Sequence, residues 1–147
     1  VRPLDKNICA HISNEEKKAY YLINKMRPAM NRIVDDLKNK APDESHKEIK
    51  TTKLERLLNQ NMEYFSKEFY YLNIDLEFMD ELIIKNFDFK KFKPYLITIE
   101  VHDFTLREKN SVFEAVLKND YEFFAYTNPT AFFINKKFKN NNFSIIG

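Results

Sequence analysis

Two carboxylates at the end of an apolar segment are the strongest candidates for chemistry in this chain. Asp75 and Glu77 close the run of apolar and aromatic residues that begins at Phe69. Alternation along a strand would place both side chains on one face, about 7 Å apart along the chain. Such a pair can orient a hydroxyl group, accept its proton or face a cation. The residues alone favour a plainer interpretation, a solvated strand end with a helix cap, because Glu77 directly precedes a predicted helix.

A second polar group follows the next apolar segment and comprises Glu100, His102 and Asp103. Glu100 and His102 share a face if the strand continues. As a metal site the pattern is weak, because the other histidines, His11 and His46, lie far away in the sequence. We therefore predict no metal site and interpret this group as a solvated loop.

The remaining reactive and basic residues favour structural roles. Cys9 has no Cys–His signature around it and is expected to be a small buried residue in a strand. Lysine and phenylalanine alternate in segments 90–93 and 136–139, a pattern that could stack on single-stranded nucleic acid. The acidic neighbours Asp88 and Glu100 and the low net charge favour a solvated face, and a nucleic-acid accessory domain is the weakest alternative.

The composition limits the classes of protein that the chain can represent. It has 147 residues, a net charge of +2, 44% hydrophobic and 31% charged residues, which predicts one folded domain of ordinary size. Apolar runs are too short to span a bilayer and residues 1–5 do not open a signal peptide, so we expect no membrane partner. The near balance of charge argues against a dedicated nucleic-acid partner. A lone cysteine favours a reducing, cytoplasmic setting.

Glycine is almost absent, and this excludes several kinds of ligand site. The only glycine is Gly147, the last residue. Phosphate cradles that depend on glycine, including the dinucleotide fingerprint and the P-loop, are therefore excluded. Together with the missing initiator methionine, this bias leads us to expect a fragment.

The hydrophobic pattern predicts strands that alternate with helices and end in a hairpin. Strands are expected over 7–12, 19–23, 48–51, 69–76, 95–101, 121–126 and 131–135, and helices from Thr52, Met79 and Thr105. Thr52 with Glu55, and Thr105 with Glu108, have the spacing of capping boxes.

This order predicts an α/β fold with a mostly parallel sheet and a terminal antiparallel hairpin. The near-continuous apolar run at 69–76 indicates a strand buried on both faces. Segment 39–47 is expected to be a loop, and 136–142 a frayed polar tail. Ligands in such sheets bind beyond the carboxyl ends of the parallel strands, here at 75–77 and 100–103.

Several segments occur in an order that points to one family. They are residues 72–80 (Leu-Asn-Ile-Asp-Leu-Glu-Phe-Met-Asp), 82–85, 87–94 and 97–100, together with 52–58, 121–134, 2–5 and 12–13. The first of these resembles the I-D-V-E-G-x-[DE] motif of the FkbM-type methyltransferases. The others are similar to the family's "evLks…dfekyrPk-ivvE" pattern, its T-x-L-D-x-L-L element, its closing "gYelva…tnaiFv" hairpin and its R-P-x-D and "vaiS" segments. The resemblance covers Arg2 to Asn135, nearly the whole chain.

The resemblance implies a partial class I, Rossmann-like methyltransferase domain over 1–136, with a polar tail over 137–147. It implies S-adenosylmethionine as the methyl donor and a sugar, polysaccharide or secondary-metabolite hydroxyl as the acceptor. Asp75 and Glu77 would be the catalytic residues, with Asp75 the better candidate for the base that takes the proton of the hydroxyl. Asp75 and Ser13 would contact the cofactor, and Asp80 would support the start of the helix.

The chain also departs from the family pattern. The glycine of the motif is Phe78 here, and the glycine before the hairpin tyrosine is Asp120. The family's sheet order is 3-2-1-4-5-7-6, and strands 1 and 2, which carry the glycine-rich cofactor loop, have no counterpart in this sequence. Strand 69–76 would then be an open sheet edge that invites self-association. The expected form is therefore truncated and inactive by itself, and the alternative is a non-catalytic interaction domain on the same scaffold.

Overall fold

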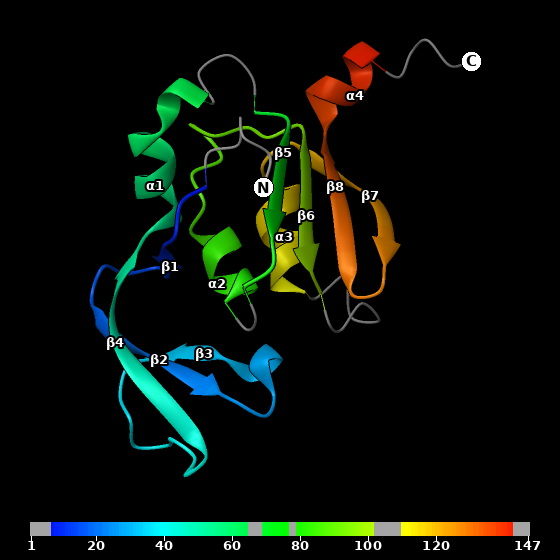
Figure 1. Cartoon of the computed structure of the whole chain (residues 1–147). Helices are drawn as coiled ribbons and strands as arrows, with labels where there is room; N and C mark the ends of the chain where they lie inside the picture. The colour runs from blue at the N-terminus through cyan, green and yellow to red at the C-terminus, as the bar shows by residue number, and fades with distance from the viewer. Residues whose placement is uncertain (1–6, 65–68, 77–78, 102–109, 143–147) are drawn as a thin grey trace. The chain divides into compact units, whose positions relative to one another are not determined.

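The computed structural model describes residues 7–64, 69–76, 79–101 and 110–142. Contacts within the chain divide it into two compact units, Val1–Leu57 and Leu58–Gly147. Each unit has its own four-stranded sheet (Figure 1). In the described part of the chain, no helix is long and apolar enough to cross a membrane.

The first unit is a twisted sheet with the strand order β1-β4-β2-β3. Its elements are β1 (His11–Ile12), β2 (Lys18–Asn24), the short helix η1 (Pro28–Met30), β3 (Arg32–Val34) and β4 (Glu44–Thr52). The nine-residue strand β4 pairs with β2 in antiparallel register along its length and with β1 in parallel at Thr51 and Thr52. Ala19, Leu22 and Ile49 are its buried apolar residues.

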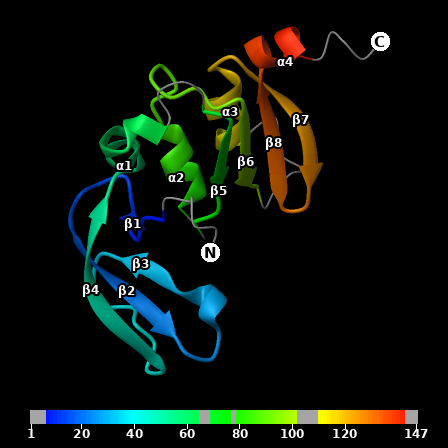
Figure 2. The same cartoon turned by 45° about the horizontal axis from the view of Figure 1, so that its top comes forward.

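The second unit is built on a sheet with the order β5-β6-β8-β7 (Figure 2). Its strands are β5 (Tyr71–Ile74), β6 (Leu96–Glu100), β7 (Tyr121–Thr127) and β8 (Thr130–Asn135). Its helices are α2 (Asp80–Lys85), α3 (Ser111–Leu117), α4 (Lys136–Asn142) and the 3-10 turn η2 (Met62–Tyr64). Helix α1 (Leu54–Gln60) spans the boundary between the two units.

One face of the second sheet forms the main core of the protein. Alternate strand residues are buried there: Leu72, Ile74, Ile97, Ile99, Ala131 and Phe133. Phe113 of α3 packs against this face, with its ring centroid 5.0 Å from that of Phe133 and 5.4 Å from that of Phe123. Burial of these apolar surfaces is the largest favourable contribution to folding of the unit.

The α/β class and the terminal hairpin are confirmed, and the expectation of a mostly parallel sheet is wrong. Parallel pairs are β1–β4 and β5–β6, whereas β2–β3, β2–β4, β6–β8 and β7–β8 are antiparallel. The physical reason is local: β2 and β3, and likewise β7 and β8, are consecutive strands joined by short connections, and antiparallel neighbours form readily across such connections.

Several predicted boundaries also need correction. The strand expected over 7–12 is only His11–Ile12, and the strand Arg32–Val34 was missed. The loop expected over 39–47 gives way to β4 at Glu44. The tail over 136–142 is the helix α4. The predicted capping box at Thr105 and Glu108 lies outside the described residues, and α3 begins with Asn110, whose side chain accepts a hydrogen bond from the Val112 N–H.

The strand at 69–76 is not buried on both faces. Its exposed and buried residues alternate, with Tyr71 and Asn73 exposed and Leu72 and Ile74 buried. Among the described strands, β5 pairs only with β6, so it lies at one edge of its sheet. The predicted edge position of this strand is therefore confirmed, while the near-continuous apolar run reflects exposed tyrosines rather than a second buried face.

Candidate active site

The parallel strands β5 and β6 end side by side and bring two carboxylates to the same end of the second sheet. The last paired residues are Ile74 and Ile99, and Asp75 and Glu100 come next on their strands. Adjacent strands lie about 4.8 Å apart, so continuing the register makes Asp75 and Glu100 neighbours. Asp75 is exposed and Glu100 is half-buried. A solvated carboxylate at this edge is open to a hydroxyl group that approaches from outside.

Asp80 holds the turn that carries Asp75. It is only 6% exposed and lies in the first turn of α2. Its Oδ1 accepts a hydrogen bond of 3.1 Å from the N–H of Leu76. A carboxylate in the first turn is also favoured by the helix dipole. Asp80 thus occupies the position expected for a residue that supports the helix start, and it fixes the chain immediately after Asp75.

Glu77, the other predicted catalytic residue, lies outside the described residues, as do Phe78, His102 and Asp103. Only Asp75 of the predicted pair can therefore be placed. No group of three or more histidine, cysteine, aspartate or glutamate side chains converges anywhere in residues 7–64, 69–76, 79–101 and 110–142.

A hydrogen-bonded array that the sequence analysis missed lies beside Asp75 on the sheet face opposite the core. The Thr98 hydroxyl donates to Asn73 Oδ1 at 2.7 Å. It therefore accepts the hydroxyl hydrogen of Tyr71, whose oxygen lies 2.7 Å away. Thr98 is 2% exposed, so this array satisfies a buried hydroxyl. Asn73 and Thr98 are register partners on the parallel strands β5 and β6, and this pairing is visible only in the structure.

The hairpin turn closes the same edge of the sheet. The Asn128–Pro129 peptide bond is cis, and the N–H of Val101 donates to the Pro129 carbonyl at 2.7 Å. The Tyr126 hydroxyl lies 3.2 Å from the Val101 carbonyl and 2.9 Å from Asn128 Oδ1. These bonds tie the end of β6 to the β7–β8 turn, next to Glu100.

Ser13, the other predicted cofactor contact, belongs to the first unit and is described there. It is buried, its N–H donates to the Thr52 carbonyl at 2.9 Å, and its hydroxyl donates to Asn14 Oδ1 at 3.3 Å. The structure therefore gives Ser13 a structural role in the turn between β1 and β2.

Two further residues correct the sequence analysis. Cys9 was expected to be buried in a strand, and it is an exposed free cysteine before β1. Phe92 of the segment 90–93 is 3% exposed and packs in the core near Phe87, so it cannot stack on a ligand.

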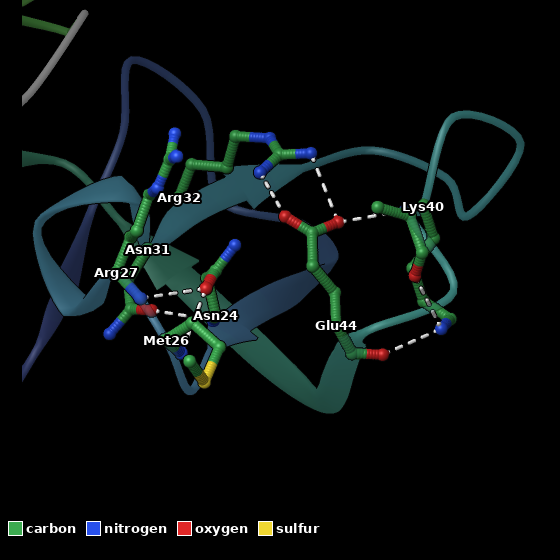
Figure 3. Close-up of polar contacts among 8 residues, drawn as sticks. Asn24, Met26, Arg27, Asn31, Arg32, Lys40 and Glu44 are labelled. Carbon is green, nitrogen blue, oxygen red and sulfur yellow. Dashed lines mark hydrogen bonds and ion pairs between the residues drawn. The ribbon is translucent and has the colours of Figure 1, made fainter.

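A second polar cluster, around Glu44 at the start of β4, is a structural clamp rather than a site (Figure 3). Arg32 pairs with both oxygens of Glu44, and Glu44 Oε2 also accepts from the Ala41 N–H at 2.9 Å. The Lys40 ammonium donates to the Glu44 carbonyl at 2.6 Å. The Arg32 guanidinium is the main cause that lowers the pKa of Glu44, followed by the Ala41 N–H. Both carboxylate oxygens and the carbonyl oxygen of Glu44 thus accept hydrogen bonds from within the fold.

The backbone turn next to this clamp is closed in the same way. Asn24 Oδ1 accepts from the N–H groups of Met26 and Arg27, and Asn31 Oδ1 accepts from the Asn24 N–H. The carboxyl edge of β5 and β6 therefore remains the better candidate for chemistry.

Comparison with known proteins adds no family to this description. No family model, no curated protein and no solved structure matches the chain.

Proposed function

We propose that the chain is the acceptor-side part of an S-adenosylmethionine-dependent O-methyltransferase of the FkbM type. The observation that carries the proposal is the strand order of the second unit. The resemblance implies the order 4-5-7-6 for this part of the sheet, and β5-β6-β8-β7 has the same order when its strands are numbered in that way. The pair β5–β6 is parallel, and the last strand, β8, lies between β6 and β7 and is antiparallel to both. This arrangement is the one that the resemblance implies for the last strand of the sheet.

A second observation supports the proposal at a single residue. The family has glycine before the hairpin tyrosine, and the corresponding residue, Asp120, has a φ of 67°. This left-handed conformation is the one that glycine adopts without a steric penalty, and aspartate tolerates it better than most residues. The backbone at Asp120 thus has a conformation that suits the glycine of the family pattern, although the side chain differs.

The described residues do not by themselves form a site for the cofactor. None of them is glycine, so they contain no glycine-rich backbone cradle. When bound, S-adenosylmethionine supplies an electrophilic methyl group. We therefore assign to this chain the acceptor side of the reaction, because the glycine-rich loop that would hold the donor has no counterpart in this sequence.

Asp75 is the residue that we assign to the chemistry. Its exposed carboxylate at the end of β5 would orient the acceptor hydroxyl and accept its proton. Asp80 acts through the turn and positions Asp75. Glu77 keeps its proposed catalytic role by resemblance alone. The acceptor class is a sugar, polysaccharide or secondary-metabolite hydroxyl, and the proposed setting is the cytoplasm, where Cys9 would stay a thiol.

The test uses the protein encoded by the complete reading frame that contains these residues. Binding of S-adenosylmethionine is measured by calorimetry, and formation of S-adenosylhomocysteine is measured with a panel of monosaccharides and polysaccharides. We expect saturable binding and acceptor-dependent product. A complete protein that neither binds the donor nor forms product would contradict the proposal.

The open edge of β5 favours a second candidate, a non-catalytic interaction domain. Tyr70 and Tyr71 are 59% and 52% exposed at this edge, and exposed strand edges recruit further strands. A second copy that pairs with β5 would add a strand at this edge. Analytical ultracentrifugation of the wild type and Asn73→Pro separates the candidates, because proline blocks strand addition. Self-association that Asn73→Pro abolishes, in a protein that does not bind the donor, would favour this candidate.

A further inference from the structure

A cluster of lysines and aromatic rings lies at one end of the second sheet, where β5 and β6 begin and β8 ends. This end is opposite the one that carries Asp75. We call it the amino-end patch, and it consists of Lys93, Lys118, Lys136, Lys137, Lys139, Tyr70, Tyr95 and Phe138. Two backbone bonds hold its segments together: the Asn135 N–H donates to the Tyr95 carbonyl at 2.9 Å, and the Lys136 N–H to the Asp120 carbonyl at 3.0 Å. Helix α4 continues from β8 at this end (Figure 1).

The aromatic rings of the patch form a row. The Tyr95 and Phe138 rings are stacked, with centroids 4.4 Å apart and an angle of 13° between their planes. Tyr70 meets Tyr95 edge to face, with centroids 5.3 Å apart. Tyr70 is nevertheless 59% exposed, so part of its ring surface is open to a ligand. The row is an aromatic platform whose rings are fixed by one another.

The charges of the second unit are separated between the two edges of its sheet. Segments 93–95, 118–122 and 135–139 contain five lysines and two acidic residues, Asp120 and Glu122. Lys139 pairs with Glu122, with 2.5 Å between Nζ and Oε1. The described residues at the carboxyl edge include Asp75, Asp80 and Glu100. The net charge of +2 averages over this separation, and the expectation that the chain has no nucleic-acid partner rested on that average.

We propose that the amino-end patch binds single-stranded nucleic acid, with phosphates on its lysines and a base stacked on Tyr70. A flexible polyanion that also carries flat rings is the ligand that matches both features of the patch. Lipid headgroups and acidic polysaccharides can also contact lysines and aromatic side chains. Nucleic acid is the better match because its bases are flat rings that stack on an aromatic ring held in place by its neighbours. The patch lies at the edge opposite Asp75, so this inference is independent of the proposed methyltransferase function.

The first experiment measures the charge contribution. Binding of a fluorescein-labelled 12-nucleotide thymidine oligomer to the full chain is followed by anisotropy as the salt concentration is raised. The variant Lys93→Gln, Lys136→Gln and Lys137→Gln should weaken binding and reduce the slope of log K against log salt by about 2, because each phosphate contact contributes roughly 0.7 for a single strand. The matched control, Lys25→Gln, Lys47→Gln and Lys50→Gln, removes the same charge from the first unit and should change the slope by less.

The second experiment measures stacking. Tyr70→Ala should weaken binding of the oligomer about 5- to 150-fold, whereas Tyr70→Phe, which keeps the ring, should bind like the wild type. An oligomer of abasic nucleotides should not distinguish Tyr70→Ala from the wild type. Circular dichroism confirms that each variant is folded, which is expected because Tyr70 and the substituted lysines are exposed.

Three results would overturn the proposal. The first is that the oligomer does not bind at 50 mM salt. The second is that the triple lysine variant of the patch and the triple control variant change the salt slope equally. The third is that Tyr70→Ala loses the same affinity for the normal and the abasic oligomer. Binding to phosphatidylserine vesicles that depends on the same lysines, without binding to the oligomer, would assign the patch to a lipid surface and would also overturn it.

Discussion

The backbone at Asp120 permits a sharp test, because two substitutions that remove the same side chain should differ in stability in the order opposite to that expected inside a helix. Asp120 has a φ of 67°, at the point where α3 ends and β7 begins. Asp120→Ala and Asp120→Gly both delete the carboxylate. They differ in the backbone: alanine incurs a steric cost of about 1–2 kcal/mol in the left-handed region, and glycine loses about 0.5–1 kcal/mol of additional conformational entropy.

The difference predicts that Asp120→Gly is more stable than Asp120→Ala by about 1 kcal/mol. For a chain of this length that corresponds to a rise in Tm of roughly 2–4 °C. Thermal unfolding followed by circular dichroism at 222 nm measures it. The control is Glu114, an exposed residue inside α3, where Glu114→Ala should be more stable than Glu114→Gly by about 1 kcal/mol. Equal stability of the two Asp120 variants, or greater stability of the alanine variant, would refute the assigned conformation.

Three further predictions concern single side chains. Asp80→Ala should destabilise the protein by about 2 kcal/mol in urea unfolding, because the Leu76 N–H loses a charged acceptor. As a control, Asp43→Ala at an exposed position should cost less than about 0.5 kcal/mol. Equal losses in the two variants would contradict the role of Asp80 in holding the turn. Burial raises the pKa of Tyr121 to about 12, so its phenol should ionise late in a spectroscopic titration. The stability of the protein should fall as pH rises from 10 towards 12, because the unfolded chain gives up this proton more readily. A Tyr121 phenol that titrates near pH 10 would be inconsistent with its burial. The pKa of Glu44 is lowered in the folded protein, so its carboxylate stabilises the fold above pH 4.5, the ordinary pKa, and this stability is lost as pH falls through the folded pKa. Glu44→Gln should therefore remove this part of the loss of stability in acid unfolding. An unchanged acid unfolding curve would exclude the Arg32–Glu44 pair as the cause.

The second unit could be predicted from local pattern to a large extent. Apart from the polar helix α4 and the misread strand β5, its helices and strands have an apolar pattern that could be recognised, and the residues Thr127 to Thr130 give a clear turn. The alternation at β5 was misread because Tyr70 and Tyr71 are apolar enough to extend the run and yet are exposed. Tyrosine can lie on either side of the surface, since its ring is apolar and its hydroxyl is polar.

The first unit was harder to predict because its pattern is weak. The segment Glu44–Thr52 contains mostly charged and polar residues, and only Ile49 marks its buried apolar side. Pairing with β2 along seven residues, rather than intrinsic preference, makes it a strand. The Arg32–Glu44 pair that anchors its start links residues 12 positions apart, which no local pattern reveals.

At the candidate site, the sequence located Asp75 at the carboxyl end of its strand and Asp80 at the helix start. It could not show the array of Tyr71, Thr98 and Asn73, because that array depends on the register between β5 and β6. Ser13 was assigned by resemblance, and its hydroxyl is used within its own turn.

The most direct test of the proposed function compares the wild type and Asp75→Asn in the complete protein. The measurement is kcat for methyl transfer from labelled S-adenosylmethionine at saturating acceptor, with Asp43→Asn as the control for an exposed aspartate. The proposed role of Asp75 predicts a fall in kcat of about 100-fold or more, with the control unchanged. Equal kcat values for Asp75→Asn and the wild type would contradict it.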